Sequence, residues 1–173
     1  MKNIYLGIGT NLGEREENLS RAMSFIIEIV GPLDAVSSIY ETEPWGFRSD
    51  EMFLNMVCKV ESQLSPRELL EAIMLIERKM GRVRGDEKYS SRIIDIDILL
   101  MDNHLVDDPD LVIPHPSMHL RKFVLLPLNE ISGDIFHPAL KKNARTLLEE
   151  CKDKSMINKY TERNQINPLS AKL

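Results

Sequence analysis

The chain has 173 residues, of which 43% are hydrophobic and 28% charged, values that fit one globular domain and exclude a disordered protein. Its net charge of −5 argues against bulk binding to nucleic acid or to an anionic membrane. Two cysteines are too few for a disulfide framework, and no apolar run approaches the roughly 20 residues of a membrane span. We therefore expect a cytoplasmic protein with no nucleic acid or membrane partner, in which residues 1–151 form one domain and residues 152–173 a polar, mobile tail.

The predicted elements follow the order strand, helix, strand, strand, helix, strand. Alternating apolar residues predict strands over residues 2–8, 33–42, 53–60 and 93–101. Apolar residues three and four apart predict helices over residues 19–30 and 66–80, the second starting at the capping sequence Ser65-Pro66-Arg67-Glu68. Asp102-Asn103 predicts a hairpin turn into residues 104–106, and short helices are expected near residues 121–130 and 144–151. This order predicts an α+β fold, a ferredoxin-like βαββαβ antiparallel sheet with helices packed on it, plus a C-terminal hairpin and short helices.

A glycine-rich turn, Gly7-Ile8-Gly9-Thr10-Asn11-Leu12-Gly13, follows the first strand and precedes the first helix. It is similar to a dinucleotide-binding fingerprint, but its third glycine is one position late and no alternating βαβ units follow. A tight structural turn is therefore the favoured interpretation. The sequence also has no P-loop, so any nucleoside triphosphate would bind without either common phosphate loop.

Asp95 and Asp97 form the most informative pair in the sequence. Strand alternation places both carboxylates on one face of the predicted strand over residues 93–101. They repel each other there unless a cation lies between them. Hard oxygen ligands of this kind bind Mg²⁺, which takes one or two carboxylates together with substrate phosphates. A solvated polar face on a half-exposed strand is the alternative, and the pair alone does not separate the two.

A basic segment, residues 81–92, leads directly into the acidic pair. Its positively charged side chains are Arg82, Arg84, Lys88 and Arg92. Guanidinium groups bind phosphate oxygens bidentately, and flanking glycines allow a loop to open and close over a ligand. Taken alone, the segment fits a solvated loop. Combined with the acidic pair, it predicts metal-assisted phosphoryl transfer.

Aromatic and amide side chains suggest a second subsite. Phe53 and Asn55 point outward from one strand, and Phe123 follows the turn around His115. Two rings can sandwich a flat heterocycle while an amide hydrogen-bonds to its edge, although ordinary core packing is the favoured interpretation for Phe123 alone. Trp45, in an aperiodic loop, is either a lid residue or a loop anchor.

In its ordered motifs, the chain resembles the family of 6-hydroxymethyl-7,8-dihydropterin pyrophosphokinases (2-amino-4-hydroxy-6-hydroxymethyldihydropteridine diphosphokinases). The resemblance runs from Ile4 to about Leu148 and includes the motifs Gly7-Ile8-Gly9-Thr10-Asn11-Leu12-Gly13, Phe53-Leu54-Asn55, Gly81-Arg82-Val83-Arg84, Arg92-Ile93-Ile94-Asp95-Ile96-Asp97 and Ile113-Pro114-His115-Pro116. It implies transfer of the terminal diphosphate of ATP to the pterin hydroxymethyl group, with release of AMP, in folate biosynthesis. It also implies a monomer with two Mg²⁺ ions.

The resemblance assigns roles to individual residues. Asp95 and Asp97 would hold the metal ions and, with Arg82 and Arg92, form the catalytic group. The ATP site would comprise Glu77, Arg82, Arg84, Tyr89, Arg92, Ile98, His115 and Arg121. The pterin site would comprise Thr42, Glu43, Trp45, Phe53, Asn55, Asp95 and Phe123.

The chain departs from the family pattern at two places. Ser90-Ser91 replaces the Gly-Pro pair that usually precedes the arginine, and Met74 replaces a common glutamine near the nucleotide. These changes affect loop restraint and base contacts rather than the metal and phosphate groups. Two rival functions remain at this stage, a ligand-binding or RNA-binding module of similar topology and a kinase that transfers only the γ-phosphate.

Overall fold

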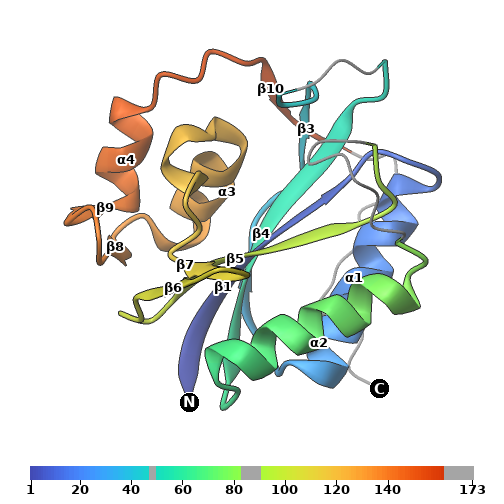
Figure 1. Cartoon of the computed structure of the whole chain (residues 1–173). Helices are drawn as coiled ribbons and strands as arrows, with labels where there is room; N and C mark the ends of the chain where they lie inside the picture. Colours follow the sequence, from blue (N-terminus) through green and yellow to red (C-terminus); the bar gives the residue numbers. More distant parts are fainter. Residues whose placement is uncertain (47–49, 83–90, 162–173) are drawn as a thin grey trace.

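The first part of the chain forms strands and two long helices, as Figure 1 shows. The computed structural model describes residues 1–46, 50–82 and 91–161. The elements up to residue 101 are β1 (Lys2–Thr10), α1 (Arg15–Ile29), β2 (Leu33–Val36), β3 (Tyr40–Thr42), β4 (Phe53–Ser62), α2 (Pro66–Lys79) and β5 (Asp95–Met101). The later elements are β6 (Val106–Asp108), β7 (Leu111–Ile113), the 3-10 helix η1 (Met118–Leu120), α3 (Lys122–Ser132), β8 (Phe136–His137), β9 (Lys142–Asn143), α4 (Ala144–Glu150) and β10 (Ile157–Lys159).

The main sheet is antiparallel and has the strand order β10-β3-β4-β1-β5, with β2 also paired to β4. Strand β1 therefore lies between β4 and β5. Helices α1 and α2 lie on one side of this sheet, and α3 and α4 lie on the other (Figure 1). This arrangement confirms the predicted ferredoxin-like α+β fold. In the described ranges, no helix is both long enough and apolar enough to cross a bilayer.

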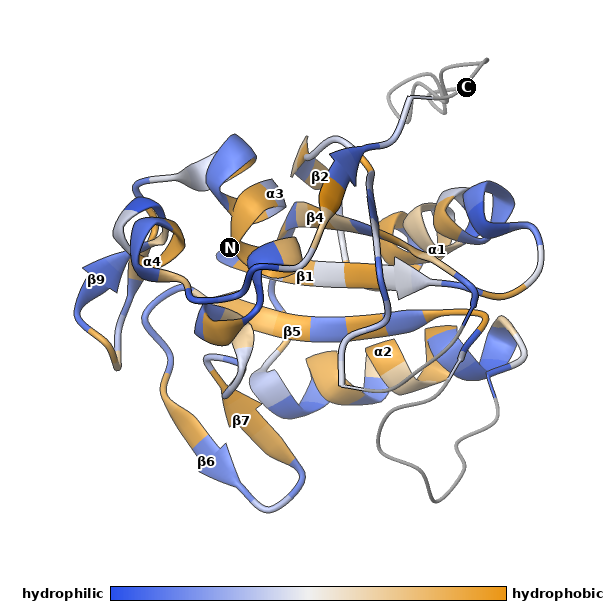
Figure 2. Ribbon diagram, turned by 90° about the horizontal axis from the view of Figure 1, so that it is seen from above, coloured by the Kyte–Doolittle hydropathy of each residue, from blue (hydrophilic) through white to orange (hydrophobic). Residues whose placement is uncertain are grey.

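Each face of the sheet has its own hydrophobic core. Leu54, Met56, Cys58 and Val60 of β4 point toward α1 and α2, whereas Val57 belongs to the core under α3 and α4. The predicted alternation of this strand is therefore confirmed. Because both faces are covered, β1 and β5 carry buried apolar side chains on both faces. In Figure 2 the orange of these strands is interrupted by pale segments in β1 and by blue segments in β5.

Local sequence signals explain where the two long helices begin and end. Ser65 accepts a hydrogen bond from the Glu68 N–H, and Glu68 Oε2 accepts one from the Ser65 N–H at 2.7 Å, so the predicted capping box starts α2. Gly31 follows α1 with φ 152°, and a Cβ at this position would lie 2.2 Å from the Glu61 carbonyl oxygen. Glycine is therefore required where the chain turns from α1 into the sheet.

The predicted strand over residues 33–42 is two strands in the structure. Ser37 interrupts it, because its hydroxyl accepts a hydrogen bond from the Val57 N–H at 2.9 Å while its own N–H donates to the Val57 carbonyl. The Ser37 hydroxyl thus replaces the backbone carbonyl that would accept this hydrogen bond in a continuous strand. This break separates β2 from β3 and allows β3 to reach the cavity described below.

Two expectations for the C-terminal half need correction. Asp102 and Asn103 do form a turn, but the strand that follows residue 105 pairs with β7 in a separate hairpin instead of returning along β5. The predicted tail over residues 152–173 contains strand β10, which pairs with β3 and extends the main sheet through residue 159, whereas residues 162–173 lie outside the described residues. In the first case, residues 106–108 pair with the segment that follows them and not with the one that precedes them. In the second, the partner β3 is distant in the sequence, and periodicity does not reveal such a partner.

Candidate active site

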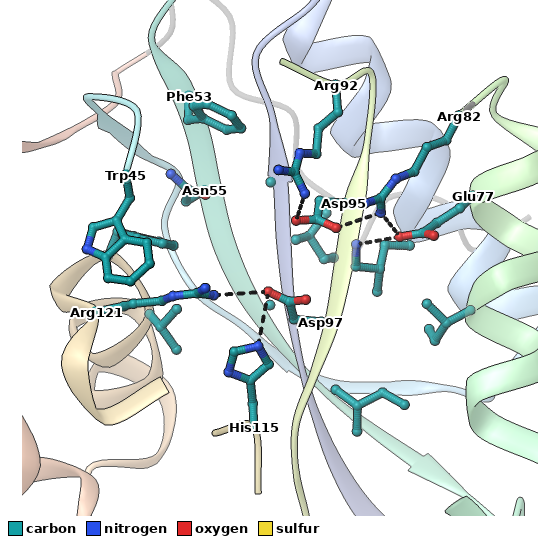
Figure 3. A pocket seen from close by; sticks show the side chains of 18 of the residues that line it. Trp45, Phe53, Asn55, Glu77, Arg82, Arg92, Asp95, Asp97, His115 and Arg121 are labelled. Atoms are coloured by element: carbon teal, nitrogen blue, oxygen red, sulfur yellow. Dashed lines mark hydrogen bonds and ion pairs between the residues drawn. The ribbon is translucent and has the colours of Figure 1, made fainter. Parts of the chain in front are cut away.

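A cavity of about 810 Å³ opens beside β5 and extends from the start of α3 to α2 (Figure 3). Cavities of this size accommodate substrate-sized molecules. Within the described chain, it collects every residue that the sequence analysis assigned to the site: Thr42, Glu43, Trp45, Phe53, Asn55, Glu77, Arg82, Arg92, Asp95, Asp97, Ile98, His115, Arg121 and Phe123. The other two predicted residues, Arg84 and Tyr89, lie outside the described residues.

The two carboxylates of β5 lie on the same face, as predicted, and each has its own basic partners. Arg82 Nη1 donates to Asp95 Oδ1 at 2.6 Å, and Arg92 Nη1 donates to Asp95 Oδ2 at 2.7 Å. Asp97 Oδ2 lies 3.5 Å from Arg121 Nη1 and 3.9 Å from His115 Nε2. Figure 3 shows Asp95 on the Arg82 side of the cavity and Asp97 on the Arg121 side.

Ionisation of Asp97 is less favourable than that of an ordinary aspartate. Burial and the neighbouring Asp95 carboxylate raise the pKa of Asp97 to about 7, although Arg121, Arg92 and Arg82 act in the opposite direction. A carboxylate with a raised pKa beside a second carboxylate is stabilised by an additional cation. Two adjacent carboxylates that open into a cavity therefore fit Mg²⁺, whose other ligands can come from substrate oxygens and water.

Glu77 connects α2 to both β5 and Arg82. Its side chain is buried, its Oε1 accepts a hydrogen bond from the Ile96 N–H at 3.1 Å, and it forms an ion pair with Arg82. Burial lowers the pKa of Arg82, but the charges of Asp95 and Glu77 outweigh this effect and raise the pKa overall. Arg82 is thus fixed as a cation at the α2 end of the cavity.

Ile98 lines the cavity but contributes differently from the charged residues. Its side chain is buried in the core formed with α1 and α2, on the face of β5 opposite to Asp97. We therefore assign Ile98 an apolar wall or a backbone contact, not a polar interaction through its side chain.

The other end of the cavity has a polar floor. Asn55 and Thr42 are both buried, and Asn55 Nδ2 donates to Thr42 Oγ1 at 2.8 Å. Gly9 of β1 passes close by, and a Cβ on Gly9 would lie 2.9 Å from Asn55 Oδ1. The glycine therefore leaves the Asn55 amide in its present position, from which it can hydrogen-bond to a flat ligand.

Aromatic side chains surround this polar floor. The Arg121 guanidinium carbon lies 4.6 Å from the ring centroid of Trp45 and 5.9 Å from that of Phe123. Stacking of this kind holds Trp45 against the start of α3. Phe53, on β4, lines the same end of the cavity (Figure 3).

Asn11 is an organising residue that the sequence analysis treated only as part of a turn. It is buried, its Oδ1 accepts a hydrogen bond from the Arg92 N–H at 2.7 Å, and its Nδ2 donates to Ser91 Oγ at 2.9 Å. Asn11 thereby fixes the backbone that presents Arg92 to Asp95. Its position after a strand and within a glycine-rich turn was the only signal, because its partners are 80 residues away in the sequence.

Comparison with known protein families identifies the arrangement. Residues 5–133 match the model of the family described as 7,8-dihydro-6-hydroxymethylpterin-pyrophosphokinase (HPPK). The chain belongs to this pyrophosphokinase family. The match contains the charged and aromatic residues of the cavity, from Thr42 to Phe123, and it ends one residue after α3.

Relatives from different bacteria match most of the chain. The 2-amino-4-hydroxy-6-hydroxymethyldihydropteridine pyrophosphokinase of Porphyromonas gingivalis is 43% identical over 135 residues, which are 76% of this chain and 92% of the relative. The protein of the same name from Bacillus subtilis is 41% identical over 137 residues, covering 78% of this chain and 81% of the relative. The family resemblance expected from the motifs is therefore confirmed.

Solved structures with the same fold include a crystal structure of the wild-type HPPK-DHPS of Plasmodium falciparum with pteroate. It superimposes with a TM-score of 0.72 at 16% sequence identity, over 86% of this chain. This chain spans only 44% of that larger protein. At this level of identity, the likeness supports the fold of the HPPK family and carries no assignment of individual residues.

Proposed function

We propose that this protein transfers the terminal diphosphate of ATP to the hydroxymethyl group of 6-hydroxymethyl-7,8-dihydropterin and releases AMP, as a step of folate biosynthesis. Membership of the pyrophosphokinase family carries this proposal. The cavity supports it, because one end is lined by carboxylates and guanidinium groups and the other by an amide floor and aromatic rings. An ATP triphosphate fits the first environment, and a flat pterin fits the second.

Asp95 and Asp97 would hold two Mg²⁺ ions together with the ATP phosphates. Bound there, the metal ions would neutralise phosphate charge and lower the cost of deprotonating the pterin hydroxyl. Asp95 already has a basic side chain against each carboxylate oxygen. When phosphate enters, Arg82 and Arg92 would move their hydrogen bonds from Asp95 to the phosphate oxygens and stabilise the migrating diphosphate.

The reaction itself requires an in-line geometry. The pterin hydroxyl oxygen would attack the β-phosphorus, a new O–P bond would form, and the bond from the β-phosphorus to the oxygen of the departing AMP would break. Guanidinium groups aimed at this centre would stabilise the charge that develops. In this scheme, Arg121 and Arg84 would bind phosphate, and Glu77, Tyr89, Ile98 and His115 would complete the ATP site.

The pterin would occupy the end of the cavity near β3 and β4. Asn55 and Thr42 would hydrogen-bond to its edge, with Glu43 and Trp45 contributing from the adjacent loop. Phe53 and Phe123 would contact the ring faces. Asp95 would lie where the pterin and the ATP phosphates meet.

The proposed setting is a cytoplasmic monomer that acts on two small molecules. The net charge of −5 supports the absence of a nucleic acid partner, since a nucleic acid binder carries an extended basic face. The basic side chains of the cavity, in contrast, are already directed at Asp95 and Asp97.

Replacement of one metal-binding carboxylate tests the proposed site. We expect Asp97→Ala to lower pterin-dependent ATP consumption at least about 10³-fold and to weaken Mn²⁺ binding measured by EPR with a non-hydrolysable ATP analogue. Asp107→Ala, which removes an exposed carboxylate of β6, serves as the matched control and should leave both quantities unchanged. Near-normal turnover or Mn²⁺ binding in Asp97→Ala would contradict the metal assignment.

A further inference from the structure

The segment of residues 152–160, here named the C-terminal strap, lies outside the matched family range of residues 5–133. It leaves α4, crosses to the opposite side of α3 and ends beside β3, as the orange and red part of the ribbon shows in Figure 1. The strap therefore contacts two elements that both form walls of the candidate pterin site. No residue of the strap lines the cavity itself.

The first contact of the strap fixes the start of α3. Asp153 Oδ2 accepts a hydrogen bond from the Lys122 N–H at 3.0 Å, and Asp153 Oδ1 accepts one from the Ser155 N–H at 2.9 Å. Lys122 is the first residue of α3, whose N–H has no acceptor inside the helix, and the N-cap residue Arg121 supplies no side-chain cap. Asp153 therefore caps α3 from 31 residues downstream.

The electrostatics of Asp153 agree with this geometry. Burial raises the pKa of Asp153, but the hydrogen bonds from Ser155 and Lys122 outweigh burial and hold the pKa below its ordinary value. Asp153 is therefore an anion at neutral pH, and an anion is favoured at the positive end of a helix dipole.

The second contact of the strap fixes β3. Ile157 is the register partner of Thr42, and the Tyr160 N–H donates to the Ile39 carbonyl at 2.8 Å. Lys159 Nζ lies 3.8 Å from Glu130 Oε1 of α3. Strand β10 thus continues along the edge of β3 as far as the residue that precedes Glu43.

These contacts connect two walls that meet at Trp45. One wall follows β3 and contains Thr42 and Trp45, whereas the other is the start of α3 and contains Arg121 and Phe123. The two walls touch where the Arg121 guanidinium lies 4.6 Å from the Trp45 ring centroid. Asp153 binds the backbone N–H between Arg121 and Phe123, so its loss would release the start of α3 relative to β3.

We propose that Asp153 is a positioning residue of the pterin site, which sets the spacing between the Trp45 wall and the Phe123 wall through the strap. This inference rests on the proposed function, since it takes the pterin to bind between these walls. Arg82, Arg92 and the β5 carboxylates lie away from the strap, and of the proposed ATP site only Arg121 lies at the start of α3. The effect of Asp153 should therefore be larger for the pterin than for ATP.

Kinetics and fluorescence together test the proposal in the full-length protein. We expect Asp153→Ala to raise the KM for the pterin about tenfold and the KM for ATP no more than about twofold, with a smaller change in kcat. Trp45 is the only tryptophan in the chain, so acrylamide quenching of its fluorescence reports on its wall in the free protein. We expect stronger quenching in Asp153→Ala than in the unmodified protein.

Two further variants make the result specific. Asp153→Asn keeps a carbonyl oxygen that can accept the Lys122 N–H, and it should restore most of the pterin KM and of the quenching. Asp134→Ala removes an exposed aspartate, 85% accessible and paired only at the surface with Arg145, and should change neither quantity. If Asp153→Ala is unstable, the pterin KM and the Trp45 quenching of Asp153→Asn still test the role of Asp153, because both should stay near the values of the unmodified protein.

The outcomes separate the inference from the function on which it rests. If the unmodified protein turns over the pterin but Asp153→Ala matches Asp134→Ala in KM and quenching, the positioning role is wrong. Equal increases in both KM values, accompanied by a fall in Tm, would indicate a purely structural residue and would also overturn it. If the unmodified protein does not use the pterin, the proposed function fails. Trp45 quenching still tests the positioning role in that case, and quenching in Asp153→Ala equal to that in the unmodified protein would reject it.

Discussion

At the scale of single residues, Asp97 shows how the site combines burial with negative charge. Its side chain is 34% exposed and lies beside Asp95, and the nearest basic atom among its ion pairs in the described residues is Arg121 Nη1 at 3.5 Å. The pKa of Asp97 is raised to about 7, so the folded protein retains a proton that the unfolded chain, with the ordinary value of 3.8, releases. The contribution of Asp97 to the stability of the metal-free protein therefore falls as pH rises between these two values.

This linkage predicts a pH-dependent effect of Asp97→Asn. The amide stays neutral in the folded and unfolded states, so the stability advantage of the variant should be smaller at pH 5, where only part of the interval between 3.8 and about 7 has been crossed. At pH 8 we expect the variant to be more stable by about 1–2 kcal/mol, or roughly 3–6 °C in Tm, a range reduced because water screens the partly exposed carboxylate. Thermal melts in EDTA at both pH values measure this gap, and a gap that does not widen with pH would contradict the raised pKa.

The hydrogen bond between Asn11 and Ser91 gives a second test at this scale. Ser91 precedes Arg92, and its hydroxyl accepts a hydrogen bond from Asn11. We expect a coupling free energy of about 0.5–1 kcal/mol between Asn11→Ala and Ser91→Ala in a double-mutant cycle followed by urea unfolding. Additive effects within about 0.3 kcal/mol would show that the two side chains do not cooperate.

The sequence revealed some of these residues and missed others for a physical reason. Asp95 and Asp97 were predictable, because strand alternation alone places them on one face. Asn11 and Asp153 were not, since their partners lie 80 and 31 residues away and no local period connects them. A residue that acts through a distant backbone N–H leaves no pattern in its own neighbourhood.

At the scale of elements, α2 is the clearest case of local sequence determining structure. The motif from Ser65 to Glu68 predicted its start, and the structure contains both hydrogen bonds of the capping box. Glu77, which pairs with Arg82, lies near the opposite end of the same helix. Most of the length of α2 therefore separates the cap at Ser65 from the cavity residue Glu77.

We expect Ser65→Ala to destabilise the protein by about 1 kcal/mol, or roughly 2–4 °C in Tm, because the Glu68 N–H loses its acceptor. Turnover at 25 °C should remain unchanged, since Glu77 is far from the cap. Ser24→Ala, at an exposed position inside α1, is the matched control and should not lower Tm. A loss of turnover without a loss of stability would contradict this separation of cap and site.

Elements that depend on tertiary pairing were harder to predict. The polar composition after residue 151 suggested a tail, yet the unpaired edge of β3 recruits residues 157–159 as a strand. An exposed strand edge offers backbone donors and acceptors to any extended segment, almost regardless of its side chains. Hydrophobic pattern is therefore a weak guide to an edge strand such as β10.

At the scale of the whole molecule, the site follows from the topology of the sheet. In the main sheet β5 ends the strand order next to β1, so its carboxylates open toward the space between α2 and α3. The order of elements predicted this sheet, and the family resemblance predicted which residues surround the cavity. Neither predicted how β3 and α3 are tied together, because that link depends on long-range contacts of the strap and of Glu130 with Ser38 and Tyr40.

The central claim is that a diphosphate, and not a single phosphate, leaves ATP. The most direct measurement is chromatographic separation of the nucleotides after incubation with ATP, Mg²⁺ and 6-hydroxymethyl-7,8-dihydropterin. Our account predicts AMP in a one-to-one ratio with the pterin consumed, no ADP, and no AMP when the pterin is omitted. Pterin-dependent ADP would identify a γ-phosphate kinase, and neither nucleotide product from folded protein would indicate a binding module; either result would contradict the account.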